Sequence, residues 1–441
     1  MTHRTALLGL GVGLALADSS IVALALPDIL GQFDVAITSV AWVLTSFNLV
    51  LAVVAVPAAY VARRGPRRAF AIGVAVFAAA SLTCGLAPSF DVLVGARCIQ
   101  AVGAALIVTA ALDLLSQVEE SDERALRVWV TAGVLGAALG PAVGGILTQL
   151  LGWESIFLVQ VPIAFTLLLA VRGLTSRSVP APAGRPSIPA NAALLFVAGG
   201  LVAALFLLVL LLVEGWGMPP AAAGLVVTVM PLTAIVVGRA RPSSLAAVPG
   251  VACGVIFLAG GLAALALMPR AGWAWTIPPQ LLVGTGLGLT VVGLTEIALR
   301  GRPDQVVHGG WTLAARHAGV VLGLLLLAPV LTGALDESRD EAIRAGAAVV
   351  LDSSIPPLDK LGVAQDVLAE VDRAEAVGKL PDVERAFAER PNDAEWSSLV
   401  SSLQDQLDRA VTSAFSGPFF LAAALTLCAL VPLLFGRRRL E

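Results

Sequence analysis

The sequence predicts an all-α membrane protein whose chain crosses the bilayer twelve times, in two groups of six helices, and three observations lead to that prediction. Hydrophobic residues make up 58% of the 441 residues and charged residues only 13%, a balance foreign to soluble chains. Nearly uncharged windows of about 20 residues recur, each long enough to span a hydrocarbon core of roughly 30 Å. A polar segment separates the first six of these windows from the last six. Because the bilayer core offers no water to backbone groups, each window is expected to be helical.

The hydrophobic windows give the expected spans in order. They lie near residues 6–31, 38–61, 69–88, 91–115, 128–150, 155–171, 191–213, 221–238, 248–268, 275–299, 308–334 and 416–436. Glycine and proline inside them are compatible with helix, because both are commoner in membrane helices than in soluble ones. The first window is longer than a signal peptide and lacks its small-residue cleavage pattern, so we expect it to remain as a span.

The basic residues predict how the chain is oriented, since short cytoplasmic loops retain Lys and Arg. The loops after even-numbered spans carry most of the arginines, whereas the short loops on the other side offer only Arg270. Both termini are therefore expected in the cytoplasm. Abundant Arg and Ala with scarce Lys favour a bacterial source, so we expect a multi-pass protein of the cytoplasmic (inner) membrane.

Two polar segments mark the expected domain boundaries. Residues 172–190 are rich in Pro, Ser and Arg and predict a cytoplasmic linker between an N-terminal six-helix bundle, 1–171, and helices 7–11 of a C-terminal bundle, 191–334. Residues 335–415 hold 17 acidic and 8 basic residues and predict a soluble, mainly helical extracytoplasmic insert. Residues 416–441 are expected to form helix 12 and a cytoplasmic tail.

One stretch of the insert has the spacing of an amphipathic helix. Its apolar anchors are Trp396, Leu399, Leu403, Leu407 and Val411. They recur at helical intervals and predict a buried stripe on one face. Two roles for the insert remain open: a solvated spacer that rejoins the last two spans, or a part in substrate handling.

Several kinds of chemistry have no signal in the sequence. The four cysteines lie inside expected spans and show neither a disulfide framework nor metal-binding spacing. There is no Walker A loop, Gly-rich dinucleotide turn or Ser/His/Asp set. We therefore expect no enzyme activity, no cofactor or metal, and no nucleic-acid partner. A six-plus-six helix chain without an ATP site predicts a secondary transporter whose halves rock about a midplane site.

The stretch GAALGPAVGG, residues 136–145, carries the most specific motif. Gly136, Gly140 and Gly144 recur every fourth residue, so they share one helix face and let a neighbouring helix approach closely. Pro141 removes one backbone hydrogen bond and permits a bend. With Gly145 the stretch resembles the antiporter signature of the major facilitator superfamily, G-x-x-x-G-P-x-x-G-G. An ordinary small-residue packing face explains the three spaced glycines but not the added proline and paired glycines.

Further segments resemble one branch of that superfamily, the drug:proton antiporter-2 (QacA-like) family. LVGARCIQAVGAA, residues 93–105, is similar to its span-four motif and places Arg97 and Gln100 on one turn. ADSSIVALALPDI, residues 17–29, resembles its span-one motif, with Asp18 and Pro27 in matching places, and GWESIFLVQVPI, residues 152–163, resembles its entry into span six. The resemblance implies the major facilitator fold and export in exchange for protons. QacA-like proteins have fourteen spans, whereas twelve are expected here.

The stretch AAYVARRGPRR, residues 58–68, resembles the superfamily's gating loop between spans two and three. It keeps the motif's glycine and arginines, which here are Gly65, Arg63, Arg64, Arg67 and Arg68. Ala58 and Ala62 replace the usual Gly and Asp. The missing Asp puts in doubt the charge lock that normally holds the outward-open state together.

Asp18 is the leading candidate for proton coupling. It lies about twelve residues from either end of the first expected span, hence roughly 18 Å deep. An ionised Asp at that depth costs about 2.5 to 3.5 kcal/mol, so it should face a cavity, meet a cation or bind a proton. Burial favours the protonated acid and a nearby cation such as Arg97 favours the carboxylate. The alternatives are an Asp18 that only packs, bonded to Ser19, Ser20 or backbone, and an Arg97 that clamps backbone carbonyls.

A second group of charged residues is a possible relay or gate: Glu296, Arg316, His317 and Asp113. Glu296 lies about a turn from the cytoplasmic end of its span, where we expect a gate salt bridge with Arg316. His317 titrates near neutral pH and is either a proton relay or a packing residue. Asp113, near the inner end of span four, is expected to be a gate or interface charge.

Together these features predict a proton-coupled exporter of hydrophobic or amphipathic small molecules such as drugs, working by alternating access as a monomer in the lipid bilayer. Asn48 and Gln100 are expected to give its cavity neutral hydrogen-bonding groups. Two alternatives stay open. One is a lipid exporter or flippase that uses a lateral gate and the insert. The other is a non-transporting membrane scaffold or receptor whose insert binds a partner.

Overall fold

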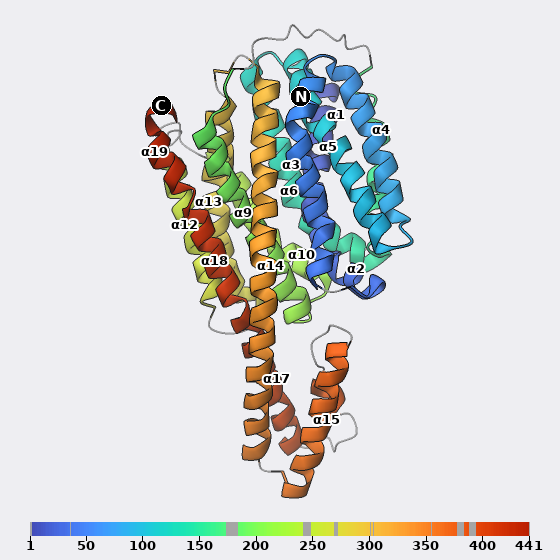
Figure 1. Ribbon diagram of the computed structural model, residues 1–441, viewed down its shortest axis with the longest axis vertical. Coiled ribbons are helices and arrows are strands. Elements are labelled where there is room, and N and C mark those ends of the chain that lie inside the picture. Colours follow the sequence, from blue (N-terminus) through green and yellow to red (C-terminus); the bar gives the residue numbers. More distant parts are fainter. Residues whose placement is uncertain are drawn as a thin grey trace.

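The computed structural model describes residues 2–35, 37–172, 184–240, 248–268, 272–299, 301–302, 304–353, 355–376, 383–387 and 394–440. Within these ranges the chain is helical and contains no strand. Figure 1 shows long helices packed side by side, with a smaller group of helices projecting from one end of the bundle. Residues 173–183 of the expected linker lie outside the described ranges.

The first half of the chain forms one side of the bundle. Its helices are α1 (His3–Ala23), α2 (Leu26–Phe33), α3 (Ile37–Ala62), α4 (Pro66–Gly85), α5 (Phe90–Val118), α6 (Asp122–Leu151), α7 (Ser155–Leu158) and α8 (Gln160–Leu167). Side-chain caps fix three starts: Thr2 accepts from the Thr5 N–H ahead of α1, Ser89 from the Val92 N–H ahead of α5, and Ser121 from the Arg124 N–H ahead of α6. The closest packing is of α1 on α6 and of α4 on α5.

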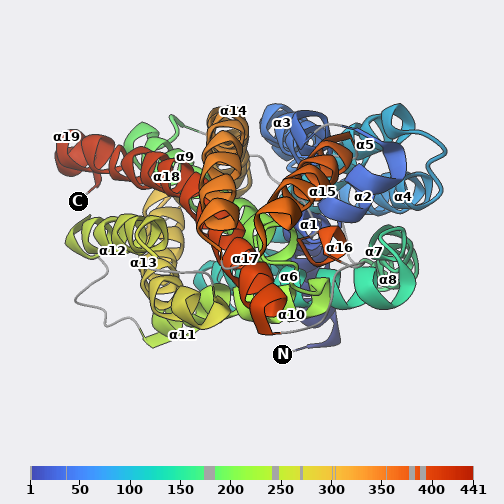
Figure 2. The ribbon, with the colours of Figure 1, turned by 90° about the horizontal axis from the view of Figure 1, so that it is seen from below.

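The second half contains the remaining helices of the bundle and the projecting group. They are α9 (Ile188–Leu210), the π-helical turn η1 (Leu211–Gly215), α10 (Pro220–Val227), α11 (Val229–Ala240), α12 (Val248–Ala266), α13 (Trp273–Leu299), α14 (Gln305–Asp352), α15 (Pro357–Ala376), α16 (Val383–Ala386), α17 (Ala394–Ala414), α18 (Ser416–Leu427) and α19 (Leu430–Leu440). Figure 2 shows the two halves on opposite sides, and α3 against α14 and α6 against α10 join them.

The expected pattern of membrane-spanning helices is confirmed. Eleven helices within the described residues are long and apolar enough to cross a membrane. The sixth expected span is shorter, since its apolar segment covers only Ser155–Leu167 and is interrupted at Val159 between α7 and α8. Pro162 has no N–H for the carbonyl of Leu158, which accounts for the weakened helix there.

The first expected span, 6–31, is not one straight helix as predicted. α1 ends at Ala23, a turn covers Leu24 and Ala25, and α2 begins at Leu26. Pro27 cannot donate to the carbonyl of Ala23, so a continuous helix would lose a hydrogen bond there, whereas the start of a new helix tolerates proline. Asp18 therefore lies in the last two turns of α1 instead of midway along one long helix.

The insert is continuous with two helices of the bundle. α14 runs unbroken for 48 residues from Gln305 to Asp352, so no helix boundary occurs at residue 335. On the way back, only Phe415 separates α17 from α18. The predicted stripe of α17 is buried at Trp396, Leu399, Leu403 and Val411, and the half-buried Leu407 packs beside it.

The two ends of the bundle are distinct. Both chain termini lie at one end, which we call the terminal end, and the insert of α15–α17 with the distal part of α14 projects from the other, the insert end (Figure 1). α2 also lies at the insert end. The insert has a small core of its own, in which Phe387 and Trp396 meet edge to face with centroids 6.1 Å apart.

Candidate functional site

Asp18 lies at the centre of a buried polar cluster in the first half. Its side chain is 0% exposed on α1. Arg97 Nη1 of α5 donates to Oδ2, while Gln100 Nε2 and Gln160 Nε2 donate to Oδ1 at 3.1 and 2.9 Å. Three side-chain donors thus take the place of the water that a carboxylate would otherwise require.

Besides α1, Arg97 contacts two other helices, α3 and α7, and Gln100 of its own helix α5. Its Nε donates to the carbonyl of Val43 on α3 at 3.1 Å, and its Nη1 also reaches Gln100 Oε1 at 2.6 Å. The guanidinium carbon lies 4.3 Å from the ring centroid of Phe47 and 5.6 Å from that of Phe157, a favourable cation–π arrangement. Nη2 is buried and has no hydrogen-bond partner among the residues that the structure describes. The arginine therefore combines the two roles that the sequence left open, pairing with Asp18 and clamping a backbone carbonyl.

Glutamine and serine side chains extend the cluster. Gln100 Nε2 lies 2.9 Å from Ser81 Oγ and 3.0 Å from Gln160 Oε1, and Ser81 Oγ donates to the Phe77 carbonyl at 2.7 Å. All three side chains are fully buried. Sequence reasoning missed Ser81 and Gln160. The signal was present, because Gln160 is an uncharged polar residue within an otherwise apolar segment of the expected sixth span.

Asn48 and His317, predicted separately, meet across the two halves. His317 Nδ1 on α14 lies 2.6 Å from Asn48 Oδ1 on α3, and Ser19 Oγ donates to the same oxygen at 3.3 Å. Asn48 Nδ2 donates to the Leu44 carbonyl, so its oxygen must be the atom that faces the histidine. The Nδ1 of His317 therefore carries the hydrogen. His317 Nε2 is buried, and none of the described residues forms a hydrogen bond with it.

A small central cavity of about 30 Å³ lies between the halves, lined by residues of both that include Leu16, Trp129, Thr312 and Arg316. Pockets for drug-sized ligands measure roughly 300 to 1,000 Å³, so this state holds no such ligand there. Neither Asp18 nor Arg97 lines the cavity.

The glycine-rich motif of α6 lies against both α1 and α10. A Cβ on Gly136 would stand 2.1 Å from the Gly13 carbonyl oxygen, and one on Gly140 would stand 2.0 Å from Ser20 Oγ. A Cβ on Gly145 would stand 2.2 Å from the Pro220 oxygen of the other half. α6 therefore connects the segment of α1 around Asp18 to the second half. Gly144 and Pro141 make similar close contacts with Ile21 and Gly224.

At the terminal end an ion pair joins the halves. Arg63 Nη1, just after α3, lies 3.1 Å from Asp304 Oδ2, and both side chains are mostly buried. Asp304 also caps α14, where its Oδ1 accepts from the Val307 N–H at 3.2 Å. Asp304 was missed by sequence reasoning, which noted only that Ala62 lacks the usual acid of the gating loop. Arg64, Arg67 and Arg68 are exposed, and Gly65 precedes α4.

The other predicted charges lie apart from the Asp18 cluster. Arg316 lines the central cavity, and Glu296 is half-buried on α13. The expected gate salt bridge between these two residues stays a prediction. Asp113, near the terminal end of α5, accepts from Gln117 Nε2 at 2.9 Å. No group of His, Cys, Asp and Glu in the described part of the chain could hold a metal ion.

Known proteins share parts of the sequence and the fold of this chain. The family model of the Major Facilitator Superfamily matches residues 8–328. Multidrug resistance protein Stp of Mycobacterium tuberculosis is 40% identical over 175 residues, covering 38% of this chain and 33% of that protein. Drug efflux pump JefA of the same species is 37% identical over 179 residues, covering 40% and 35%. Methylenomycin A resistance protein of Bacillus subtilis is 34% identical over 185 residues, covering 41% and 40%.

These sequence matches span only 33% to 40% of the length of those relatives. A solved structure covers nearly the whole chain. A bacterial homolog to the human lysosomal transporter Spinster, in an inward-facing and occupied conformation, aligns over 98% of this chain and 97% of that chain, with a TM-score of 0.66 and 17% sequence identity. At that identity the likeness concerns the fold alone.

Proposed function

Because this multi-pass membrane protein belongs to the major facilitator superfamily, we propose that it exports hydrophobic or amphipathic small molecules, drugs among them, in exchange for protons. The names of the relatives, a multidrug resistance protein and a drug efflux pump, support drugs as the substrate class. Secondary transporters of this kind work by rocking two halves about a central site. Membership in this family supports a role as a transporter in place of an enzyme.

The observation that carries proton coupling is the fully buried pair of Asp18 and Arg97. The charged carboxylate is stable while the guanidinium and two glutamine amides donate to it. When a proton binds, Arg97 keeps the Val43 carbonyl and Gln100 Oε1 as acceptors. Each glutamine amide also has an oxygen that can accept from a protonated carboxyl. Both protonation states of Asp18 therefore find hydrogen-bond partners in the cluster, and protonation removes the counter-charge of Arg97.

The contacts of α1 couple that acid to the rocking of the halves. Gly13 and Ser20 flank Asp18 and touch α6, and α6 touches Pro220 of the second half. A tilt of the second half thus shifts the backbone that carries Asp18. The link from Ser19 through Asn48 to His317 offers the proton a polar route to the interface between the halves. We assign Glu296, Arg316 and Asp113 to a gate at the cytoplasmic opening of the space between the halves.

The orientation belongs to the same proposal. Both termini share the end of the bundle where the arginines of the gating loop lie, which the preference for cytoplasmic Lys and Arg assigns to the cytoplasm. The insert then faces the outside of a bacterial inner membrane. The transporting unit is one monomer. It comprises the two bundles at 1–171 and 191–334, the insert at 335–415 and helix 12 at 416–441.

The test is proton-driven transport by purified protein in liposomes. With an imposed pH gradient, a fluorescent cationic dye and a neutral hydrophobic drug should both move against their own gradients. Asp18→Asn should abolish that movement, whereas Asp91→Asn, an exposed acid at the start of α5, should leave it intact. Transport by Asp18→Asn at the wild-type, gradient-dependent rate would refute the assignment.

A further inference from the structure

Gln160 is the side chain that the sixth expected span contributes to the Asp18 cluster. It is the first residue of α8 and follows Val159, where the helix is interrupted. Its side chain is 0% exposed. A buried amide must find its hydrogen bonds inside the protein. The direction of those bonds therefore shows which protonation state of Asp18 the residue favours.

The nitrogen of the Gln160 amide faces the acid. Its Nε2 donates to Asp18 Oδ1 at 2.9 Å. A hydrogen bond to a charged acceptor is roughly twice as strong as one to a neutral acceptor. This contact therefore stabilises the carboxylate of Asp18 more than the protonated acid.

Two neighbours fix the orientation of that amide. Gln160 Oε1 accepts from Gln100 Nε2 at 3.0 Å and from Ser81 Oγ at 3.2 Å. If the amide turned over, its oxygen could accept from a protonated Asp18, but its nitrogen would face the N–H groups of Gln100 and lose that bond. The neighbours thus hold Gln160 in the orientation that donates to Asp18.

The donors to Asp18 come from two different helices. Among the described residues they are Arg97 and Gln100, which both belong to α5, and Gln160 of α8. A displacement of α8 relative to α5 would therefore withdraw Gln160 and leave the other two donors in place. Of the three, Gln160 is the donor that a movement of the sixth span can remove.

Few other ionisable groups approach Asp18. The nearest besides Arg97 is Cys84 of α4, whose Sγ lies 4.0 Å from Gln100 Oε1. His317 of α14 is connected to α1 through Asn48 and Ser19. α8 and α9 contain no ionisable residue, and those of α3 and α6 lie near the terminal end. Hydrogen bonds within the cluster therefore have a large share in setting the protonation of Asp18.

We propose that Gln160 is a positioning residue that keeps Asp18 charged in this state, and that the sixth span controls through it when Asp18 takes up a proton. Withdrawal of α8 removes a donor from the carboxylate, so the acid then binds a proton more readily. The inference rests on the proposed function in one respect, because it takes Asp18 as the proton carrier.

Infrared difference spectroscopy across a pH titration tests this role in the purified full-length protein in lipid nanodiscs. The carbonyl band that Asp18→Asn removes reports the protonated carboxyl of Asp18. Gln160→Met keeps a side chain of similar length but has no donor, so it mimics the withdrawal of α8. It should move the midpoint of that band upward by about one pH unit. The pH profile of transport in liposomes should move by the same amount.

Two further variants complete the test. Gln280→Met removes a buried glutamine of α13 that donates to Thr276, and it should leave the midpoint unchanged. Ser81→Ala removes one donor to Gln160 Oε1 and should move the midpoint upward by less than Gln160→Met does. It also replaces Gln160→Met in the test if that variant does not fold.

The outcomes separate this inference from the proposed function. A titrating Asp18 band whose midpoint is the same in the wild type and in every folded variant at Gln160 and Ser81 would overturn the role of Gln160 alone. An equal shift in Gln280→Met would also overturn it, because the shift would then be a general effect of losing a buried amide. Absence of an Asp18 band at every pH would overturn the proposed proton coupling and this inference with it.

Discussion

Arg63 and Asp304 form a 3.1 Å ion pair that joins the gating loop of the first half to the cap of α14 in the second. The usual acid of this loop is replaced by Ala62, so the negative charge comes from the opposite half. The pair is mostly buried, so the attraction between its charges is screened less by salt than that of an exposed ion pair. We propose that this link keeps the terminal end closed.

Asp304→Asn should weaken that closure without unfolding α14, because asparagine caps a helix as well as aspartate does. We expect faster labelling, by a maleimide, of a cysteine placed at Thr312 in a background without native cysteines, by several-fold relative to the parent. The reversed pair Arg63→Asp with Asp304→Arg should recover part of the slow labelling. Equal labelling rates in all three proteins would show that the ion pair does not control the gate.

Asp18→Asn should also lower stability, since it leaves the guanidinium of Arg97 buried without a counter-charge. Removal of one partner of a buried ion pair costs about 3 to 5 kcal/mol. The double variant Asp18→Asn with Arg97→Gln removes both charges and should regain most of the melting temperature while remaining inactive in transport. A double variant as unstable as the single one would contradict the role of the unpaired charge.

Gly136→Ala should destabilise the packing of α6 on α1. The added methyl would meet the backbone of Gly13, which cannot rotate away, so the two helices must separate at a cost of about 1 to 3 kcal/mol. Gly95→Ala is the matched control, because a Cβ at Gly95 on α5 has no atom within 4 Å. Thermal unfolding in one detergent compares the two. Equal melting temperatures would indicate that the α1–α6 contact is loose.

His317→Gln should separate hydrogen bonding from titration. Glutamine can still donate to Asn48 Oδ1, but it cannot take up a proton. If His317 passes protons to the interface, the variant should keep its melting temperature and lose most of the dependence of transport on pH between about 5 and 8. An unchanged pH profile would leave His317 as a packing residue that joins α3 to α14.

The sequence predicted the elements of this fold better than the contacts between them. Windows of apolar residues locate spans because the bilayer imposes helix on every one of them. The break in the first span was missed because hydropathy does not change across Leu24 and Ala25. Pro27 breaks the helix through the backbone, because it has no N–H to donate to the carbonyl of Ala23. Likewise, charge composition found the insert but did not show that α14 continues through residue 335.

The candidate site, too, was predicted only in part. Asp18 and Arg97 were predicted as a pair because an ion inside an apolar span has few partners. Gln160 and Ser81 were missed because uncharged polar side chains stand out less and can bond within their own helix. Asp304 was missed because its partner Arg63 is far away in sequence, and only the packing of the halves brings the two together.

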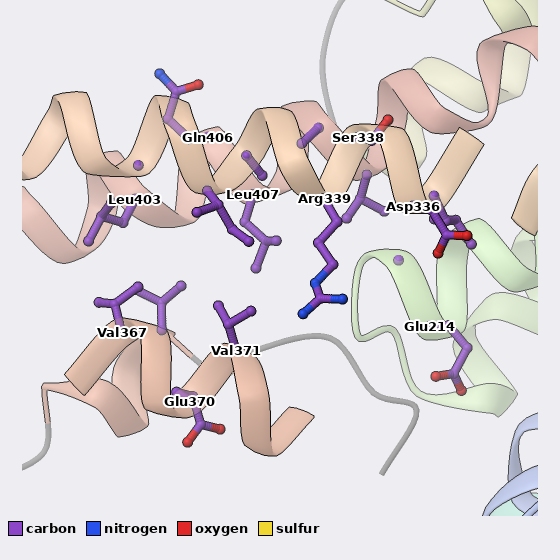
Figure 3. Close-up of a pocket in the computed structure, with 18 of the residues that line it drawn as sticks. Glu214, Asp336, Ser338, Arg339, Val367, Glu370, Val371, Leu403, Gln406 and Leu407 are labelled. Carbon is purple, nitrogen blue, oxygen red and sulfur yellow. The ribbon is translucent and has the colours of Figure 1, made fainter. Parts of the chain in front are cut away.

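The length of α14 has a mechanical consequence. At 1.5 Å per residue its 48 residues form a rod of about 72 Å that reaches from the Asp304 cap to the far end of the insert. Any tilt of the second half must therefore tilt the whole of α14, and the insert moves with it. Leu26 and Val40 of the first half help to line a cavity of about 460 Å³ between the insert and the bundle (Figure 3), so the proposed rocking of the halves would narrow and widen that cavity in each cycle.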